Sequence, residues 1–288
     1  MTFRFTAFAF VLAAAPGVLA DSTISPASPY SFSANVGWLN NKHDQPSAPA
    51  GLVVSEYTVQ GYAYGANIGW IRFGSGSPAN GVRYSNVAGD TGVNHNGAGD
   101  LSGYAYGANV GWISFNASPS SPDRPRVNLA NGTFAGYAYG ANIGWVNLAT
   151  LTTSTISAPD TDADGIADSW EIEHFSNLTT ANATSDSDGD GATDLTEYTA
   201  MSDPSDATKF FKITSQTLDA GMAKMTLVFT TNGARLYRLQ WSPDLAVWVN
   251  DASGIQKPDA GPTTTKFITF PAGSQRFFRV VAIKPLQN

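Results

Sequence analysis

The ten residues "GYAYGANIGW" at 61–70 recur along the chain. The same letters return at 136–145, and at 103–112 with Val110 in place of isoleucine. A looser copy, "PYSFSANVGW", occupies 29–38. The tryptophans of successive copies are separated by 32, 42 and 33 residues. Periods of this length are typical of repeat architectures, in which each unit buries an apolar face against its neighbour.

Each copy predicts a β-hairpin. In the 61–70 copy, Tyr62 and Tyr64 lie on one face of a strand, and Gly65-Ala66-Asn67 supplies the turn. The run that begins at Gly69 returns as the partner strand. We therefore expect an antiparallel β-repeat domain that closes into a small barrel, prism or propeller-like ring, because closure removes exposed strand edges.

The repeated aromatic residues allow two interpretations. The one we prefer is a stacked aromatic core, because each aromatic side chain buries about 150–250 Å². The alternative is a set of exposed platforms for sugar rings, with the repeated asparagines donating hydrogen bonds. The residues concerned are Tyr62, Tyr64, Asn67, Trp70, Tyr104, Tyr106, Asn109, Trp112, Tyr137, Tyr139, Asn142 and Trp145.

Composition divides the chain into regions. Its 288 residues suggest about two domains. Its net charge of −7 comes from one segment, because residues 160–206 hold 13 of the 23 acidic residues and no Lys or Arg. We expect a β-repeat domain over 21–150, a Ser/Thr-rich linker over 151–159, an acidic segment over 160–208 and a C-terminal domain over 209–288.

Residues 1–20, "MTFRFTAFAFVLAAAPGVLA", have the layout of a secretory signal peptide. Their apolar run is too short to span a bilayer and contains Pro16-Gly17. We expect a secreted or cell-surface protein whose mature chain has no transmembrane segment. No basic stripe interleaved with aromatic residues is present, which speaks against a nucleic-acid partner. The chain has no cysteine, so bound metal is the obvious substitute for disulfides.

Two twelve-residue stretches in the acidic segment fit the pattern of a calcium-binding loop. They are "DTDADGIADSWE" at 160–171 and "DSDGDGATDLTE" at 186–197. Ca²⁺ takes about six to eight oxygen ligands, which such a loop supplies from fixed positions. The expected ligands of two Ca²⁺ ions are Asp160, Asp162, Asp164, the carbonyl of Ile166, Asp168, directly or through water, Glu171, Asp186, Asp188, Asp190, the carbonyl of Ala192, Asp194 and Glu197.

The same segment resembles the thrombospondin type 3 repeat as it occurs in secreted bacterial proteins. The resemblance rests on "DSWEIEHF", "DGATDLTEY" and "SDPSD", the last at 202–206, and it covers about 50 residues. It implies calcium-dependent spacing or surface attachment through EF-hand-like loops. A dockerin is the alternative, since it also consists of two loop-helix calcium repeats. Dockerin loops usually end in Asp, where this chain has Glu171 and Glu197.

The C-terminal region predicts a small antiparallel β-sandwich. Six or so strands fit into about 80 residues, and Asn232-Gly233 between two alternating runs predicts a hairpin. The region resembles C-terminal β-modules that follow such calcium repeats in exported bacterial proteins. That resemblance implies sorting or envelope contact.

No catalytic motif is present in the sequence. The three histidines, His43, His95 and His174, are expected at the surface, and neither a nucleophile elbow nor a phosphate loop is found. We expect a mainly β, non-enzymatic protein, with a hydrolase assembled from distant residues as an alternative. The expected role is that of a secreted calcium-binding structural or adhesive protein. A carbohydrate-binding module is the second function, with surface polysaccharide or envelope components as the partners.

Overall fold

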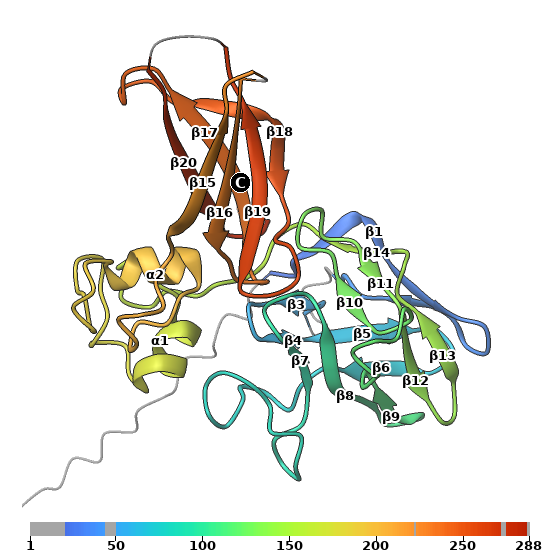
Figure 1. Cartoon of the computed structure of the whole chain (residues 1–288). Coiled ribbons are helices and arrows are strands. Elements are labelled where there is room, and N and C mark those ends of the chain that lie inside the picture. The colour runs from blue at the N-terminus through green and yellow to red at the C-terminus, as the bar shows by residue number, and fades with distance from the viewer. Residues whose placement is uncertain (1–20, 44–49, 222, 272–274, 287–288) are drawn as a thin grey trace, which may run out of the picture.

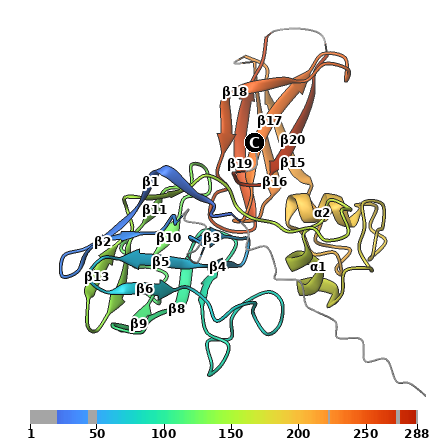
Figure 2. The same ribbon diagram turned by 180° about the vertical axis from the view of Figure 1, so that it is seen from behind.

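The repeated hairpins form one body of the structure, and the C-terminal strands form another (Figures 1 and 2). The computed structural model describes residues 21–43, 50–221, 223–271 and 275–286, and the predicted signal peptide lies outside them. Two short helices lie beside both bodies. The chain is therefore mainly β, as the sequence predicted, with a loop-helix segment between two β-domains.

Four hairpins, one from each sequence copy, build a closed barrel of eight strands. They are β1 (Ile24–Ser33) with β2 (Gly37–Asn40), β5 (Tyr62–Gly65) with β6 (Gly69–Arg72), β8 (Leu101–Gly107) with β9 (Gly111–Ser114), and β12 (Tyr137–Gly140) with β13 (Gly144–Asn147). Each hairpin pairs with the next through β2–β5, β6–β8 and β9–β12. The last hairpin returns to the first through β13–β1. Of the three closed forms that the repeats allowed, the barrel is the one observed.

Small and aliphatic side chains fill the interior of the barrel. Ala63 and Ile71 form an inward cross-strand pair, and both are buried. The other hairpins place Ala105 with Ile113 and Ala138 with Val146 in the same way. A side chain at Gly65 would lie 2.7 Å from Ile68, so the close packing at this end requires glycine.

The expectation of an aromatic core is wrong, because the repeated Tyr and Trp side chains lie on the outside of the barrel. Side chains alternate between the two faces of a strand, so the alanine and isoleucine positions that fill the interior direct Tyr64 and Trp70 outward. Trp112 is 51% exposed and Trp145 is 62% exposed.

The turn asparagines join the four hairpins at one end of the barrel. The Asn67 amide donates to the carbonyl oxygen of Val36 at 3.1 Å. The remaining turns repeat this bond: Asn109 donates to Ile68, Asn142 to Val110 and Asn35 to Ile143. The four bonds form a closed ring, so the amide groups predicted to contact sugar are used by the barrel itself.

Further strands join the sheet of the barrel. They are β3 (Val53–Val54), β4 (Thr58–Gln60), β7 (Val93–His95) and β14 (Leu151–Thr153), whereas β10 (Arg126–Val127) and β11 (Phe134–Ala135) form a separate two-stranded sheet. β7 pairs with β8, and β14 pairs with β1. The segment predicted as a linker, 151–159, therefore begins as a barrel strand, and its Ile156 is buried in the barrel core.

The C-terminal domain is a sandwich of two three-stranded antiparallel sheets, as predicted. Its strands are β15 (Ile213–Asp219), β16 (Lys224–Thr230), β17 (Leu236–Ser242), β18 (Val249–Gln256), β19 (Thr263–Thr269) and β20 (Phe277–Ile283). The predicted hairpin at Asn232-Gly233 is wrong, because β16 pairs with β15 and β19, whereas β17 pairs with β18 and β20. The turn crosses between sheets, and Asn232 is held there by a side-chain bond to the carbonyl oxygen of Met201.

The acidic segment folds into two loop-helix units around a small core. The helices are α1 (Asp168–Phe175) and α2 (Asp194–Ala200). Trp170 of α1 is fully buried against Tyr198 of α2, with ring centroids 5.7 Å apart. Among the residues that the structure describes, no helix has the length and apolar character needed to cross a membrane.

Candidate metal centre

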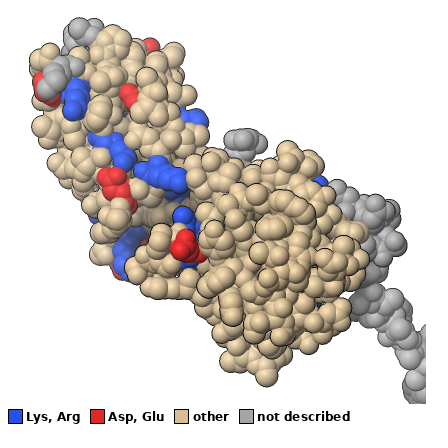
Figure 3. Space-filling view, turned by 90° about the vertical axis from the view of Figure 1, so that its right-hand side faces the viewer, with Lys and Arg blue, Asp and Glu red and all other residues tan. Residues whose placement is uncertain are grey.

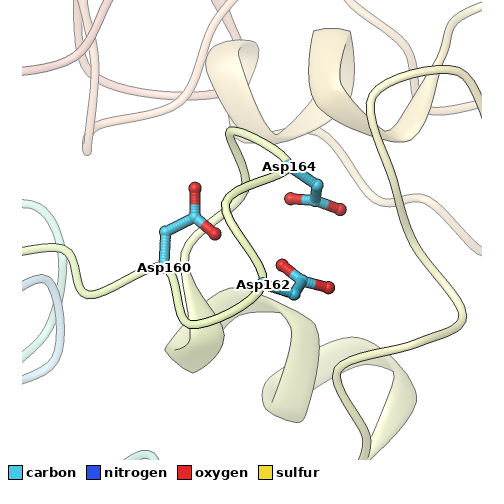
Figure 4. A group of neighbouring side chains, drawn as sticks. All are labelled: Asp160, Asp162 and Asp164. Carbon is cyan, nitrogen blue, oxygen red and sulfur yellow. The ribbon is translucent and has the colours of Figure 1, made fainter.

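Three aspartates of the first loop direct their carboxylates toward one another (Figure 4). Asp160, Asp162 and Asp164 each offer an oxygen, and these oxygens all lie within 4.8 Å of one another. Such an arrangement brings like charges together, and a cation between them removes the repulsion. The cluster has the donor set of a site for a hard metal ion.

The loop backbone explains why the carboxylates converge. Gly165 takes a φ of 98°, a conformation that favours glycine, and its N–H donates to Asp160 Oδ2 at 2.9 Å. The N–H of Ile166 donates to Asp164 Oδ1 at 2.8 Å. These bonds use one oxygen of each carboxylate and leave the other free to bind a metal ion.

The second loop repeats this geometry. Asp186, Asp188 and Asp190 form a second group with oxygens within 4.8 Å of one another. Gly191 has a φ of 95° and donates to Asp186 Oδ2 at 3.0 Å, and Ala192 donates to Asp190 Oδ1 at 2.7 Å. Two stretches with different intervening residues thus adopt one loop conformation.

A buried glutamate in the first turn of each helix completes the acidic set. The side chain of Glu171 is 0% exposed, and neither of its carboxylate oxygens has a hydrogen-bond partner. Glu197 is equally buried; its Oε1 accepts from Ser202 at 2.9 Å, and its Oε2 has no partner. Burial, together with the neighbouring aspartates, raises the pKa of each glutamate to about 7.

The buried oxygens without partners test whether a metal ion fits. Four aspartates, two in each loop, also have one buried oxygen without a hydrogen-bond partner; they are Asp160, Asp164, Asp188 and Asp190. Buried polar atoms are normally satisfied, and a buried unpaired carboxylate is costly. A cation bound in each loop would satisfy these atoms, so the residues present fit the predicted metal.

Two of the predicted ligands make other contacts. Both oxygens of Asp168 accept bonds from Thr161, at 2.7 Å from its N–H and at 2.6 Å from its hydroxyl. Asp194 accepts the corresponding bonds from Ser187. The structure therefore gives these two carboxylates the role of closing the loop onto its helix. Ile166 and Ala192 were predicted to contribute carbonyl oxygens, and both lie in the loops at the expected position.

Comparison with models of protein families, with curated proteins and with solved structures gave no match. The assignment of this centre therefore rests on its own residues: two groups of three aspartates that can each hold a metal ion.

Sequence reasoning missed a buried polar junction beside the second loop. Arg235, at the start of the sandwich, is 2% exposed. Its guanidinium donates to the carbonyl oxygens of Tyr198 at 2.7 Å and of Thr199 at 2.9 Å. Glu56 of the barrel lies 3.6 Å from the same guanidinium and accepts a bond from the Tyr198 hydroxyl at 3.3 Å. The junction thus joins the barrel, α2 and the sandwich.

A signal for this junction was present in the sequence. Glu56 is the only glutamate outside the acidic segment, and it stands within the apolar run "VVSEYTV". Its neighbour in space, His95, was expected at the surface, but it is buried, with Nδ1 3.0 Å from the carbonyl oxygen of Glu56. Burial lowers the pKa of His95, so the ring is held in its neutral form.

A second ion pair ties α1 to the barrel side. Arg83 Nη1 lies 2.6 Å from Glu173 Oε1, and Ile172 of the same helix packs against Gly81. Both helices that follow the acidic loops therefore contact the barrel side. Helix α1 does so through Glu173 and Arg83, and α2 through the bond from the Tyr198 hydroxyl to Glu56.

Proposed function

We propose that the protein is a calcium-binding structural protein in which two Ca²⁺ ions order the segment 160–208. The observation that carries the proposal is the set of buried carboxylate oxygens without partners in two loops of the same conformation. A bound ion in each loop would replace repulsion between acids by coordination, and binding would contribute directly to the stability of the segment.

The donor set favours calcium over other ions. Every candidate side-chain ligand is a carboxylate, which suits hard cations and not the softer metals that prefer Cys or His. Mg²⁺ requires near-ideal octahedral geometry and usually keeps several waters, whereas Ca²⁺ accepts more oxygens at varied angles. A twelve-residue loop that ends in a buried glutamate fits the larger ion.

Coupling between calcium and domain arrangement follows from the second helix. Glu197, a proposed ligand, immediately precedes Tyr198 and Thr199, whose carbonyl oxygens accept the bonds from Arg235. Calcium that fixes Glu197 would also fix the last turn of α2, whose carbonyl oxygens accept the bonds from Arg235. We infer that the two ions hold the barrel and the sandwich in one arrangement.

The proposal places the protein outside the cytoplasm and gives it a structural or adhesive role. Export rests on the signal peptide predicted at 1–20, and a thrombospondin type 3-like spacer rests on the resemblance of the acidic segment. Among the described residues, the groups of three acidic side chains that come together are those of the two loops, and we assign them to metal binding.

Small-angle X-ray scattering of the full chain tests the coupling. With millimolar calcium we expect one compact particle, and with EGTA a larger maximum dimension as the domains separate. E197Q should behave in calcium as the wild type does in EGTA, whereas D123N, which alters an exposed barrel aspartate, should not. Scattering curves that are the same with calcium and with EGTA would contradict the proposal.

A further inference from the structure

Four aromatic clusters stand on the outer surface of the barrel. In each hairpin the tryptophan packs against the residue opposite it on the partner strand. The ring centroids are 4.9 Å apart in the pairs Phe32–Trp38, Tyr64–Trp70 and Tyr139–Trp145, and 4.8 Å apart in Tyr106–Trp112. The interplanar angles lie between 56° and 58°. The barrel therefore repeats this aromatic pair four times, and in the second copy the ring of His43 also lies 4.8 Å from Trp70.

The fold does not account for these exposed rings. The inward position that follows the tryptophan varies among the copies as Leu39, Ile71, Ile113 and Val146, all of which are buried. The outward position is tryptophan in every copy; Trp38, Trp112 and Trp145 are exposed, whereas Trp70 is half-buried. Packing tolerates exchange among aliphatic side chains, so the residue that does not vary is the one that contributes least to the core. Repeated exposed aromatic clusters are typical of a binding surface.

A polar residue borders each aromatic cluster. The register of the barrel places Asn40 opposite Tyr64, Ser114 opposite Tyr139, Asn147 opposite Phe32 and Arg72 opposite Tyr106. These pairs join neighbouring hairpins on the outer face. Each cluster thus combines a flat apolar ring with a hydrogen-bonding side chain at its edge.

The surface around the clusters carries little charge. Arg72 is the one charged residue within the eight barrel strands. Figure 3 shows a barrel face almost free of charged side chains, on the side where β1, β12 and β13 lie. A polyanion or an anionic lipid surface would require basic residues, so the matching ligand is neutral.

The arrangement of the clusters argues against a second copy of this chain as the occupant. The clusters face outward from all four hairpins of a closed barrel. A twofold interface covers one patch on each partner, so a dimer would leave the remaining clusters exposed. A polymer of repeating units can engage several clusters in turn.

We propose that each aromatic cluster binds a sugar ring of a neutral polysaccharide. Pyranose rings present C–H groups on one face and hydroxyl groups at their edge. The C–H face stacks on the tryptophan and tyrosine rings through apolar contact and weak hydrogen bonds. The edge hydroxyls bond to the bordering Asn40, Ser114, Asn147 or Arg72. This inference goes beyond the calcium proposal and does not depend on it.

Affinity electrophoresis of the full chain tests the proposal. The gels contain hydroxyethylcellulose, galactomannan or neutral xylan, with alginate as an anionic comparison, and each is run with calcium and with EGTA. We expect at least one neutral polysaccharide to retard the wild type, W112A/W145A to be retarded less, and the variant W38A/W70A/W112A/W145A to run as in an empty gel.

Controls separate binding from folding. W248A makes the same change in the sandwich and should keep full retardation, and thermal unfolding verifies that each variant folds. If the fourfold variant unfolds, the retardation of W112A/W145A tests the proposal by itself. Trp112 and Trp145 are exposed, so their replacement leaves the barrel interior unchanged.

Several results would overturn the proposal. They are no retardation of the wild type in any neutral gel, retardation by alginate alone, retardation unchanged in W112A/W145A, and retardation lost in W248A. Self-association of the wild type in sedimentation velocity that disappears in W112A/W145A, without retardation, would assign the clusters to a second copy instead.

Discussion

Arg235 donates a hydrogen bond of 2.7 Å to the carbonyl oxygen of Tyr198, the residue that follows the proposed metal ligand Glu197. The bond joins the C-terminal sandwich to the helix of the second acidic loop. Because the guanidinium is 2% exposed and also lies 3.6 Å from Glu56, the sandwich, the loop-helix segment and the barrel meet at one buried charge.

Replacing Arg235 should strongly destabilise this junction. R235M removes the cation that lies 3.6 Å from the buried Glu56 carboxylate and leaves only the influence of Lys284. Removing one partner of a buried ion pair costs about 3–5 kcal/mol. Burial already raises the pKa of Glu56. We expect urea unfolding to show this loss, with part of it recovered in R235M/E56Q. The exposed Arg279 is the matched control, and an R279M variant as destabilised as R235M would contradict the account.

Removing calcium should loosen the acidic segment before the barrel. Trp170 is fully buried among residues of the two loop-helix units, and those units have no other large core. In EGTA we expect amide hydrogen exchange to become faster over 160–208 and to stay unchanged in the strands β5, β6, β8 and β9. Equal protection of 160–208 in calcium and in EGTA would refute this prediction.

Calcium affinity should rise with pH between about 5 and 8. Burial, followed by the charges of the loop aspartates, raises the pKa of Glu171 and Glu197 from 4.5 to about 7 in the metal-free chain. A proton and a metal ion compete for these carboxylates, so calcium binding releases protons below pH 7.

The stability of the metal-free chain should change in the opposite direction. Between pH 4.5 and 7 the folded state binds more protons at these two groups than the unfolded state does. Stability therefore falls as pH rises through that window.

Calorimetric titration with calcium, in buffers of different ionisation enthalpy, measures the protons that calcium binding releases. Proton release that does not depend on pH would exclude these two carboxylates as ligands.

The ring of asparagine bonds should contribute to barrel closure. N109A removes the 3.0 Å bond to the carbonyl oxygen of Ile68, and we expect a loss of about 1 kcal/mol in the free energy of unfolding. N142A removes the equivalent bond to Val110 and should cost a similar amount. A stability of N109A equal to that of the wild type would assign the ring no structural role.

Local patterns in the sequence predicted the hairpins and both acidic loops. Alternation and turn residues determine a hairpin, and ligand positions in a twelve-residue loop are fixed by spacing alone. The two loops therefore adopt the expected conformation around Gly165 and Gly191.

Features that depend on residues far apart in the chain were not predictable in the same way. Whether Tyr64 or Ala63 faces inward depends on the width of the barrel, which all four hairpins determine together. The smaller side chain, Ala63, faces inward because the barrel is narrow. The turn at Asn232-Gly233 has a hairpin sequence, yet Tyr237 and Met201 hold Asn232 in a crossover between sheets. The pairing of Arg235 with Glu56 joins residues of different domains and leaves no local pattern.

The most direct test of the central claim is calorimetric titration of the metal-free full chain with calcium chloride. We predict two Ca²⁺ ions per chain for the wild type and for D123N. D160N/D162N should bind one ion, in the second loop. D186N/D188N should also bind one ion, in the first loop. A wild-type chain that binds no calcium, or a stoichiometry unchanged when either loop is altered, would contradict the assignment of the two loops as calcium sites.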